Sequence, residues 1–128
     1  MHAFRAAVEA RDHEGIVAAL ASDVLIYSPV AHRPFDGREA AAGLFTALLD
    51  TFEDFAYTDE IADGGTVALL FSARVGDKRL QGLDWLRLDD DGLVKELTVM
   101  IRPLSGIAAL GEAMAPKVEG LAKAEGPV

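Results

Sequence analysis

The sequence predicts an α+β fold in which a long, curved antiparallel sheet packs against helices from the N-terminal part of the chain. Apolar residues recur at helical three- and four-residue steps over much of residues 2 to 49, whereas β-rich segments joined by short turns fill residues 52 to 103. Runs of strands that follow runs of helices are typical of α+β domains. A curved sheet with helices on one face forms a half-open cone, and the space between the layers is a natural pocket.

The composition is that of one ordinary domain. The chain has 128 residues, 51% of them hydrophobic, which is enough for a single packed core. It has no cysteine, so it has neither disulfides nor thiolate metal sites. Its formal net charge of −9 argues against a nucleic-acid partner, because phosphate neutralisation needs a stripe of Lys and Arg.

No segment has the pattern of a membrane span or a signal peptide. No apolar run reaches roughly 18 residues, and the N-terminus lacks a basic region followed by an apolar one. We therefore expect a single domain over residues 1–128 that is cytoplasmic and has no membrane partner.

Helical patterns dominate the first part of the chain. The segment His2 to Leu20 predicts two short helices, or one helix bent near Arg11. A β-rich strand follows at Val24 to Ser28 and is closed by Pro29. A further helix is expected from Gly37 to about Leu49.

Four strands joined by tight turns are expected next. On the first of them, alternation places Phe55, Tyr57 and Ile61 on one face and polar residues on the other. A last helix, Ser105 to Lys123, should be broken or kinked at Pro116, and it can cover an opening of the sheet or pack on a partner. The four strand segments are Phe52 to Ala62, Val67 to Val75, Arg79 to Leu88 and Leu93 to Arg102, with turns at Gly64-Gly65, Gly76 to Lys78 and Asp89 to Gly92.

Asp84 breaks the apolar pattern of its strand, where it shares a face with Leu86. It can point outward, pair with a cation such as Arg74 or Arg102, or stand in a cavity. In a dry cavity its pKa should rise, because burial disfavours the charged form. A neutral carboxyl can donate a hydrogen bond to a developing enolate, and an ionised one can take a proton from an acidic carbon.

Three segments, in this order, resemble the nuclear transport factor 2-like superfamily and its SnoaL-like domains. They are FRAAVEARDHEGIVAALASDVLIYSP, PFDGREAAAGLF and GLDWLRLDDDGLVKELTV. The superfamily includes polyketide cyclases, limonene epoxide hydrolases and ketosteroid isomerases. The resemblance implies a cystatin-like cone, and because this fold hosts many chemistries it does not by itself imply one function.

The resemblance assigns roles residue by residue. Asp84 stands where ketosteroid isomerases keep an oxyanion-hole Asp and SnoaL-like cyclases an acid/base Asp. The isomerases' Tyr falls on Phe4, which has no hydroxyl, and their general-base Asp falls on Ser28. Two isomerase groups are therefore absent, which argues against ketosteroid isomerase chemistry. The Arg, second Asp and Tyr/Asn pair of limonene epoxide hydrolases are not placed either.

The predicted pocket combines Asp84 with an apolar wall. Tyr27 can donate a hydrogen bond to a substrate carbonyl, or it is a core aromatic residue. His32 can shuttle a proton, or it is an exposed loop residue. The three scattered histidines and the acidic turn Asp89 to Asp91 do not form a metal site, so neither metal nor organic cofactor is expected. The predicted substrate-binding residues are Phe4, Tyr27, Ser28, His32, Phe45, Phe71, Leu97 and Val99.

Two hypotheses about function remain open. The first is an acid/base enzyme (an isomerase, cyclase or hydrolase) that acts on a small, largely apolar carbonyl compound through Asp84. The second is a non-catalytic module for ligand binding or dimerisation. Trp85 and Arg87 alternate with Asp84 and should lie on the opposite face of the sheet, where a homodimer would form, joined by Met100 and Arg102 if the register allows. Alternatively, Trp85 is buried under the last helix of its own chain.

Overall fold

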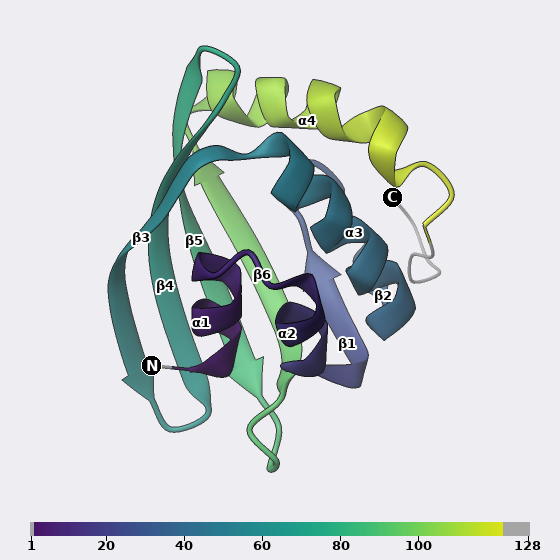
Figure 1. Cartoon of the computed structure of the whole chain (residues 1–128), viewed down its shortest axis with the longest axis vertical. Coiled ribbons are helices and arrows are strands. Elements are labelled where there is room, and N and C mark those ends of the chain that lie inside the picture. The colour runs from purple at the N-terminus through teal and green to yellow at the C-terminus, as the bar shows by residue number, and fades with distance from the viewer. Residues whose placement is uncertain (1, 122–128) are drawn as a thin grey trace.

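A six-stranded sheet forms one layer of the computed structural model, which describes residues 2 to 121. Three helices cover one face of this sheet, and a fourth crosses its end (Figure 1). The α+β fold class predicted from the sequence is confirmed. The helices are α1 (Ala3–Glu9), α2 (His13–Ala18), α3 (Arg38–Thr51) and α4 (Leu104–Val118).

The strands lie in the order β2-β1-β6-β5-β4-β3. The pairings among β3 to β6 are antiparallel as predicted, and so is that of β1 with β2. The pairing of β1 with β6 is parallel, so the sheet is mixed rather than wholly antiparallel. The strands are β1 (Leu20–Tyr27), β2 (Phe35–Asp36), β3 (Glu53–Asp63), β4 (Thr66–Val75), β5 (Lys78–Leu88) and β6 (Val94–Arg102).

The opening segment forms two short helices, which was one of the two predicted alternatives; the other was a single helix bent near Arg11. Arg11 between them has φ 53, a left-handed conformation that ends α1. The Asp12 side chain then accepts a hydrogen bond from the Gly15 backbone N–H at 3.1 Å and caps α2. Strand β1 starts at Leu20 rather than Val24, because a register shift between Leu20 and Leu25 interrupts the alternation that would have revealed it.

Strand β3 contains an irregularity that changes which residues face the helices. Its register against β4 shifts between Tyr57 and Asp59, so every later side chain changes face. Ile61, predicted on the same face as Phe55 and Tyr57, is therefore 72% exposed on the outer face. Glu60 lies on the inner face instead, opposite Leu69.

Helix α4 runs through Pro116 and ends at Val118, so of the two predicted alternatives, a break or a kink at Pro116, the break is wrong. Pro116 lies in the last turn, and because proline has no backbone N–H, this position gives up one hydrogen bond of the helix. The helix packs closely on β5, since a Cβ on Gly106 would lie 2.8 Å from the Leu80 Cβ. Residues 122 and 123 of the predicted helix lie outside the described residues.

The core lies between the helices and the inner face of the sheet. Its largest fully buried side chains come from α1, α2 and the four strands β1, β4, β5 and β6. None of the described helices is long and apolar enough to cross a membrane. The largest fully buried side chains are Phe4, Ile16, Leu20, Val24, Ile26, Leu69, Phe71, Leu86, Val94 and Leu97.

Candidate functional site

A cavity of about 310 Å³ lies between the helices and the inner face of the sheet. Its volume is near the lower end of the range for small-molecule sites. Its wall is mostly apolar, and α4 contributes Leu110, Met114 and Val118 to it. The few polar residues in the wall are Glu9, Arg11, Ser28, Asp54, Tyr57 and Asp84.

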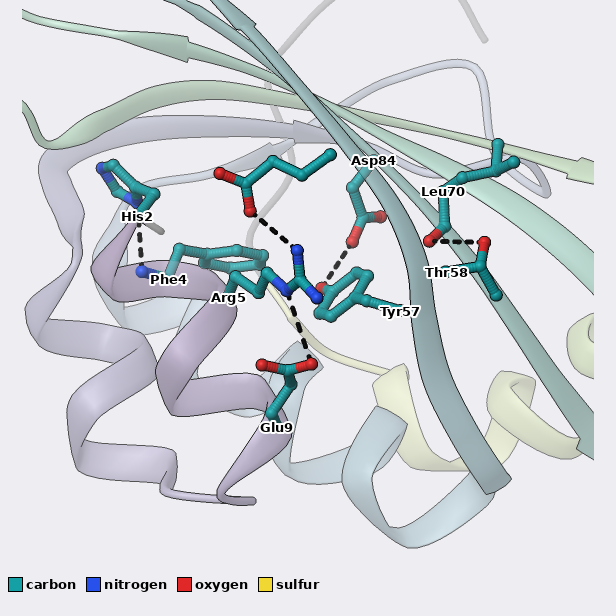
Figure 2. Close-up of polar contacts among 9 residues, drawn as sticks. His2, Phe4, Arg5, Glu9, Tyr57, Thr58, Leu70 and Asp84 are labelled. Atoms are coloured by element: carbon teal, nitrogen blue, oxygen red, sulfur yellow. Dashed lines mark hydrogen bonds and ion pairs between the residues drawn. The ribbon is translucent and has the colours of Figure 1, made fainter.

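Asp84 lies on the inner face of β5, between Leu69 of β4 and Val99 of β6. Its side chain is buried and lines the cavity. The Tyr57 hydroxyl donates a hydrogen bond to Asp84 Oδ2 at 2.8 Å (Figure 2). No residue among 2 to 121 donates to the other carboxylate oxygen, Oδ1.

The environment of Asp84 favours its protonated form. Burial raises the pKa of Asp84 to about 7, and the hydrogen bond from Tyr57 acts against this by stabilising the charged form. A carboxyl with this pKa exists in both forms at neutral pH. It can therefore accept or donate a proton, as acid/base chemistry requires.

Tyr57 is the important polar partner that the sequence prediction missed. It comes from β3, and its hydroxyl is buried against Asp84. Burial, and then the nearby Asp84 carboxylate, raise the pKa of Tyr57 well above its usual range, so its hydroxyl keeps its proton and stays a donor. Its predicted place on the same face as Phe55 was the available signal, but strand alternation does not say which strands become neighbours.

Arg5 of α1 supports Tyr57 from the helix side of the cavity. Its guanidinium lies 5.7 Å from the centre of the Tyr57 ring, in a cation–π arrangement. Its Nη1 donates to Glu60 Oε1 at 3.0 Å, and its Nε lies 3.4 Å from Glu9 Oε2. These contacts, drawn in part in Figure 2, tie α1 to β3 at the level of Tyr57.

The structure does not bring either predicted cation to Asp84. Arg74 pairs with Glu53 and with Asp54, whose Oδ2 lies 2.6 Å from the Arg74 Nε. Arg102 is exposed, opposite Gln81 at the end of β6. Asp84 therefore stands in a cavity rather than in an ion pair or in bulk water.

Most of the predicted lining residues surround this cavity, but two do not. Tyr27 lies between Ile26 and Ser28 on β1, and those two line the cavity, so alternation turns the Tyr27 side chain to the other face. His32 is exposed in the loop between β1 and β2. The predicted residues that do line the cavity are Phe4, Ser28, Phe45, Phe71, Leu97, Val99 and Asp84.

Aromatic rings form one wall beside Asp84. The rings of Phe55 and Phe71 stack with centroids 4.8 Å apart, and Tyr57 meets Phe55 edge to face at 5.0 Å. Phe71 lies across its strand partner Gly82, where an added Cβ would come within 2.1 Å of the ring. Glycine at this position therefore makes room for the ring.

Metal ligands are not grouped in the described part of the chain. Among residues 2 to 121, no three His, Cys, Asp or Glu side chains come together in a way that could hold a metal ion.

Comparison with known proteins agrees with this architecture. The model of the SnoaL-like domain family matches residues 1–97. A steroid delta-isomerase from Pseudomonas aeruginosa is 41% identical, with a TM-score of 0.84, over 90% of this chain and 85% of that one. An uncharacterised protein with a cystatin-like fold from Silicibacter pomeroyi is 29% identical, with a TM-score of 0.87, over 92% and 84%.

A more distant likeness shows the fold alone. An NTF2-like protein of unknown function from Cytophaga hutchinsonii is 18% identical, with a TM-score of 0.63, over 79% of this chain and 85% of that one. No protein of curated function matches the chain.

Proposed function

The chain belongs to the SnoaL-like domain family, and on that premise we propose that it is an enzyme that moves protons on a small, largely apolar carbonyl compound. The observation that carries this proposal is the Asp84 carboxyl. It lines an apolar cavity, burial raises its pKa to about 7, and its Oδ1 has no donor among the described residues.

The proposed reaction needs one carboxyl group. Ionised Asp84 takes a proton from the carbon next to the substrate carbonyl, and the electron pair of that C–H bond moves toward the carbonyl oxygen to give an enolate. Neutral Asp84 then returns the proton to the same or another carbon of the conjugated system, and the carboxylate is regenerated. Tyr57 holds Oδ2 throughout, so Oδ1 is the oxygen that exchanges the proton.

The relative called a steroid delta-isomerase supports a proton-transfer reaction more than it supports a steroid substrate. Phe4 and Ser28 stand where the family resemblance places a hydroxyl donor and a second carboxylate. Both line the cavity, but Phe4 cannot donate a hydrogen bond and Ser28 is a poor base at neutral pH. We therefore assign both proton transfers to Asp84.

A simple β,γ-unsaturated cyclohexenone tests the proposal. We expect the protein to convert it to the conjugated isomer, which absorbs in the ultraviolet, and to exchange its acidic protons with deuterium oxide. Asp84→Asn should lower both rates about 100- to 10,000-fold while the fold is kept. Asp59→Asn, a change at an exposed carboxyl on β3, is the matched control and should leave both rates unchanged. Equal rates in wild type and Asp84→Asn would remove the enzyme proposal.

A second candidate function is that of a non-catalytic ligand-binding module. Phe4 has no hydroxyl to donate and Ser28 is not a carboxylate base, and the absence of these two groups favours a binding module. In that case the cyclohexenone would bind, as chemical shift changes in the cavity residues would show, but it would neither isomerise nor exchange protons.

We also propose that a second copy of the chain covers the outer face of the sheet. Trp85 lies there between Ala68 and Thr98, with its buried Nε1 lacking a hydrogen-bond partner among the described residues. Ile61 is 72% exposed and Met100 49% exposed on the same face. The outer-face residues Arg87 and Glu96 carry opposite charges, which suits a two-fold contact in which one patch meets itself.

A further inference from the structure

The cavity wall contains three charged residues besides Asp84, and two of them form ion pairs whereas the third does not. Glu9 and Asp54 are both carboxylates in the wall, and each already pairs with an arginine. Glu9 Oε2 lies 3.4 Å from Arg5 Nε, and Asp54 Oδ2 lies 2.6 Å from Arg74 Nε. Arg11 lines the same wall, yet no carboxylate among residues 2 to 121 pairs with it.

Arg11 is exposed, but hydrogen bonds to its neighbours hold it in place. It lies in the link between α1 and α2, where its backbone N–H donates to the Val8 carbonyl at 3.0 Å. Its Nη2 donates to the Leu49 carbonyl at 2.5 Å, in the last turn of α3. The partial negative charge at a helix C-terminus stabilises a cation there.

The remaining donors of Arg11 are available to a ligand. A guanidinium has five N–H donors in a planar fork, and one of them is used by the Leu49 carbonyl. This fork matches a carboxylate, which it can bind through two parallel hydrogen bonds. Arg5 is shared by Glu9 and Glu60, and Arg74 is shared by Glu53 and Asp54, so carboxylates outnumber arginines in both clusters. Outside Asp84, Arg11 is the charged residue of the cavity wall that has no partner of opposite charge among residues 2 to 121.

We infer that the ligand of this cavity is a keto acid whose carboxylate binds Arg11 while its carbonyl end reaches Asp84. The apolar wall between the two groups would then hold the carbon skeleton. This inference rests on the proposed function in one respect, which is that the reacting compound occupies this cavity. It adds to that function the chemical class of the substrate and a residue that selects it.

Paired probes with and without the negative charge test the inference on the full chain. Levulinate and benzoylpropionate are keto acids with a small and a larger apolar body, and their primary amides keep the shape without the charge. Dissociation constants would be measured by NMR titration for wild type, Arg11→Gln and Lys78→Gln. Lys78 is exposed at the start of β5, so its replacement changes the net charge equally without touching the cavity.

We expect wild type to bind at least one acid about tenfold more tightly than its amide, which is the effect of one charge-assisted hydrogen bond. Arg11→Gln should remove this preference and keep the affinity for the amide within about twofold of wild type. Lys78→Gln should keep the preference for the acid. Added salt should weaken the preference of wild type for the acid, since Arg11 is exposed and its charge is screened. If Arg11 is only a structural contact of α3, its replacement would lower the melting temperature and leave the preference intact.

The inference would be overturned by equal affinity for acid and amide in wild type, by a preference that survives in Arg11→Gln, or by the absence of binding of all four probes. Asp84→Asn separates this result from the proposed function. A preference retained in Asp84→Asn, together with unmeasurable proton exchange in wild type, would support Arg11 as the selecting residue and reject catalysis. Proton exchange without any preference for the acids would support catalysis by Asp84 and reject Arg11 as the selecting residue.

Discussion

Asp84 and Trp85 are neighbours on β5, but their side chains face opposite sides of the sheet. Each has a buried polar group, and the two groups differ in whether they have a hydrogen-bond partner within the chain. On the inner face, the Asp84 carboxyl receives a hydrogen bond from Tyr57 of the same chain. On the outer face, the Trp85 indole N–H is buried without a partner among the described residues, with Arg87 lying 5.8 Å from its ring centre. The buried carboxyl on the inner face thus has a hydrogen-bond partner within the chain, whereas the buried indole N–H on the outer face has none among the described residues.

This difference fits the proposal that the inner face binds a small ligand and the outer face a second copy of the chain. An unsatisfied buried donor costs free energy, so proteins keep few of them. A cavity with a hydrogen-bonded carboxyl suits a small ligand, whereas a sheet face with exposed Met100 and Ile61 suits a second protein surface. Four measurements test this difference between the two faces.

The largest expected effect is the pH dependence of stability that comes from Asp84. Its pKa is about 7 when folded and 3.8 without the protein's influence, so between these values the unfolded state loses the proton that the folded state keeps. The free energy of unfolding should therefore fall as the pH rises through this window, by a few kcal/mol at most. Urea titrations at about pH 4.5 and about pH 8 would measure it.

The control for this prediction is the pair of variants Asp84→Asn and Asp59→Asn. The first should lose this component of the pH dependence, and the second, exposed on β3, should retain it. Identical pH profiles for wild type and Asp84→Asn would mean that the carboxyl does not titrate as its burial implies.

The next effect concerns the close packing of the inner face. Gly82→Ala would place a Cβ 2.1 Å from the Phe71 ring, so the ring must move into the cavity or the strands must part. We expect a loss of about 1–3 kcal/mol in the free energy of unfolding. Gly65→Ala is the matched control, because its Cβ would lie 3.5 Å from the nearest heavy atom, in ordinary contact. Equal stability of both variants would contradict the close packing.

Removal of the Tyr57 hydroxyl should have a smaller effect on stability and a clear effect on titration. The hydroxyl lowers the pKa of Asp84, so Tyr57→Phe should raise that pKa further and cost about 1 kcal/mol. If Asp84 acts as the base, the midpoint of the pH–rate profile should move upward and the rate at neutral pH should fall. Tyr27→Phe, which changes a hydroxyl away from the cavity, should leave the midpoint unchanged. A downward shift in Tyr57→Phe would reverse the assigned role.

The smallest effect on the site itself is expected from the outer face. Met100→Glu should prevent two copies from meeting, so the mass in solution would change from that of a dimer to that of a monomer, while proton transfer per chain stays the same. Leu104→Glu alters a residue that is 79% exposed at the start of α4 and should leave the dimer intact. A wild-type monomer at high concentration would refute the proposal that this face binds a second copy.

Patterns within single segments were enough to predict much of the fold. Alternation along β5 and β6 placed Leu97 and Val99 on the face of Asp84, where the structure also has them. Helical spacing gave α1, α2 and α3, because an apolar stripe needs no knowledge of its partner. The wrong face for Ile61 and the unexpected place of Tyr27 share one cause, since strand phase depends on bulges and starting points that local pattern does not reveal.

The sequence by itself therefore determined the α+β class and the apolar character of the strand face that carries Asp84, because burial of apolar side chains sets both. It left open whether Asp84 points outward, pairs with a cation or stands in a cavity, and the structure decided for the cavity. Tertiary structure alone decided that Tyr57 meets Asp84, that β1 runs parallel to β6, and that Arg11 reaches the same cavity. These contacts join residues from separate elements, and their distances depend on strand order and register, which emerge when the whole chain packs.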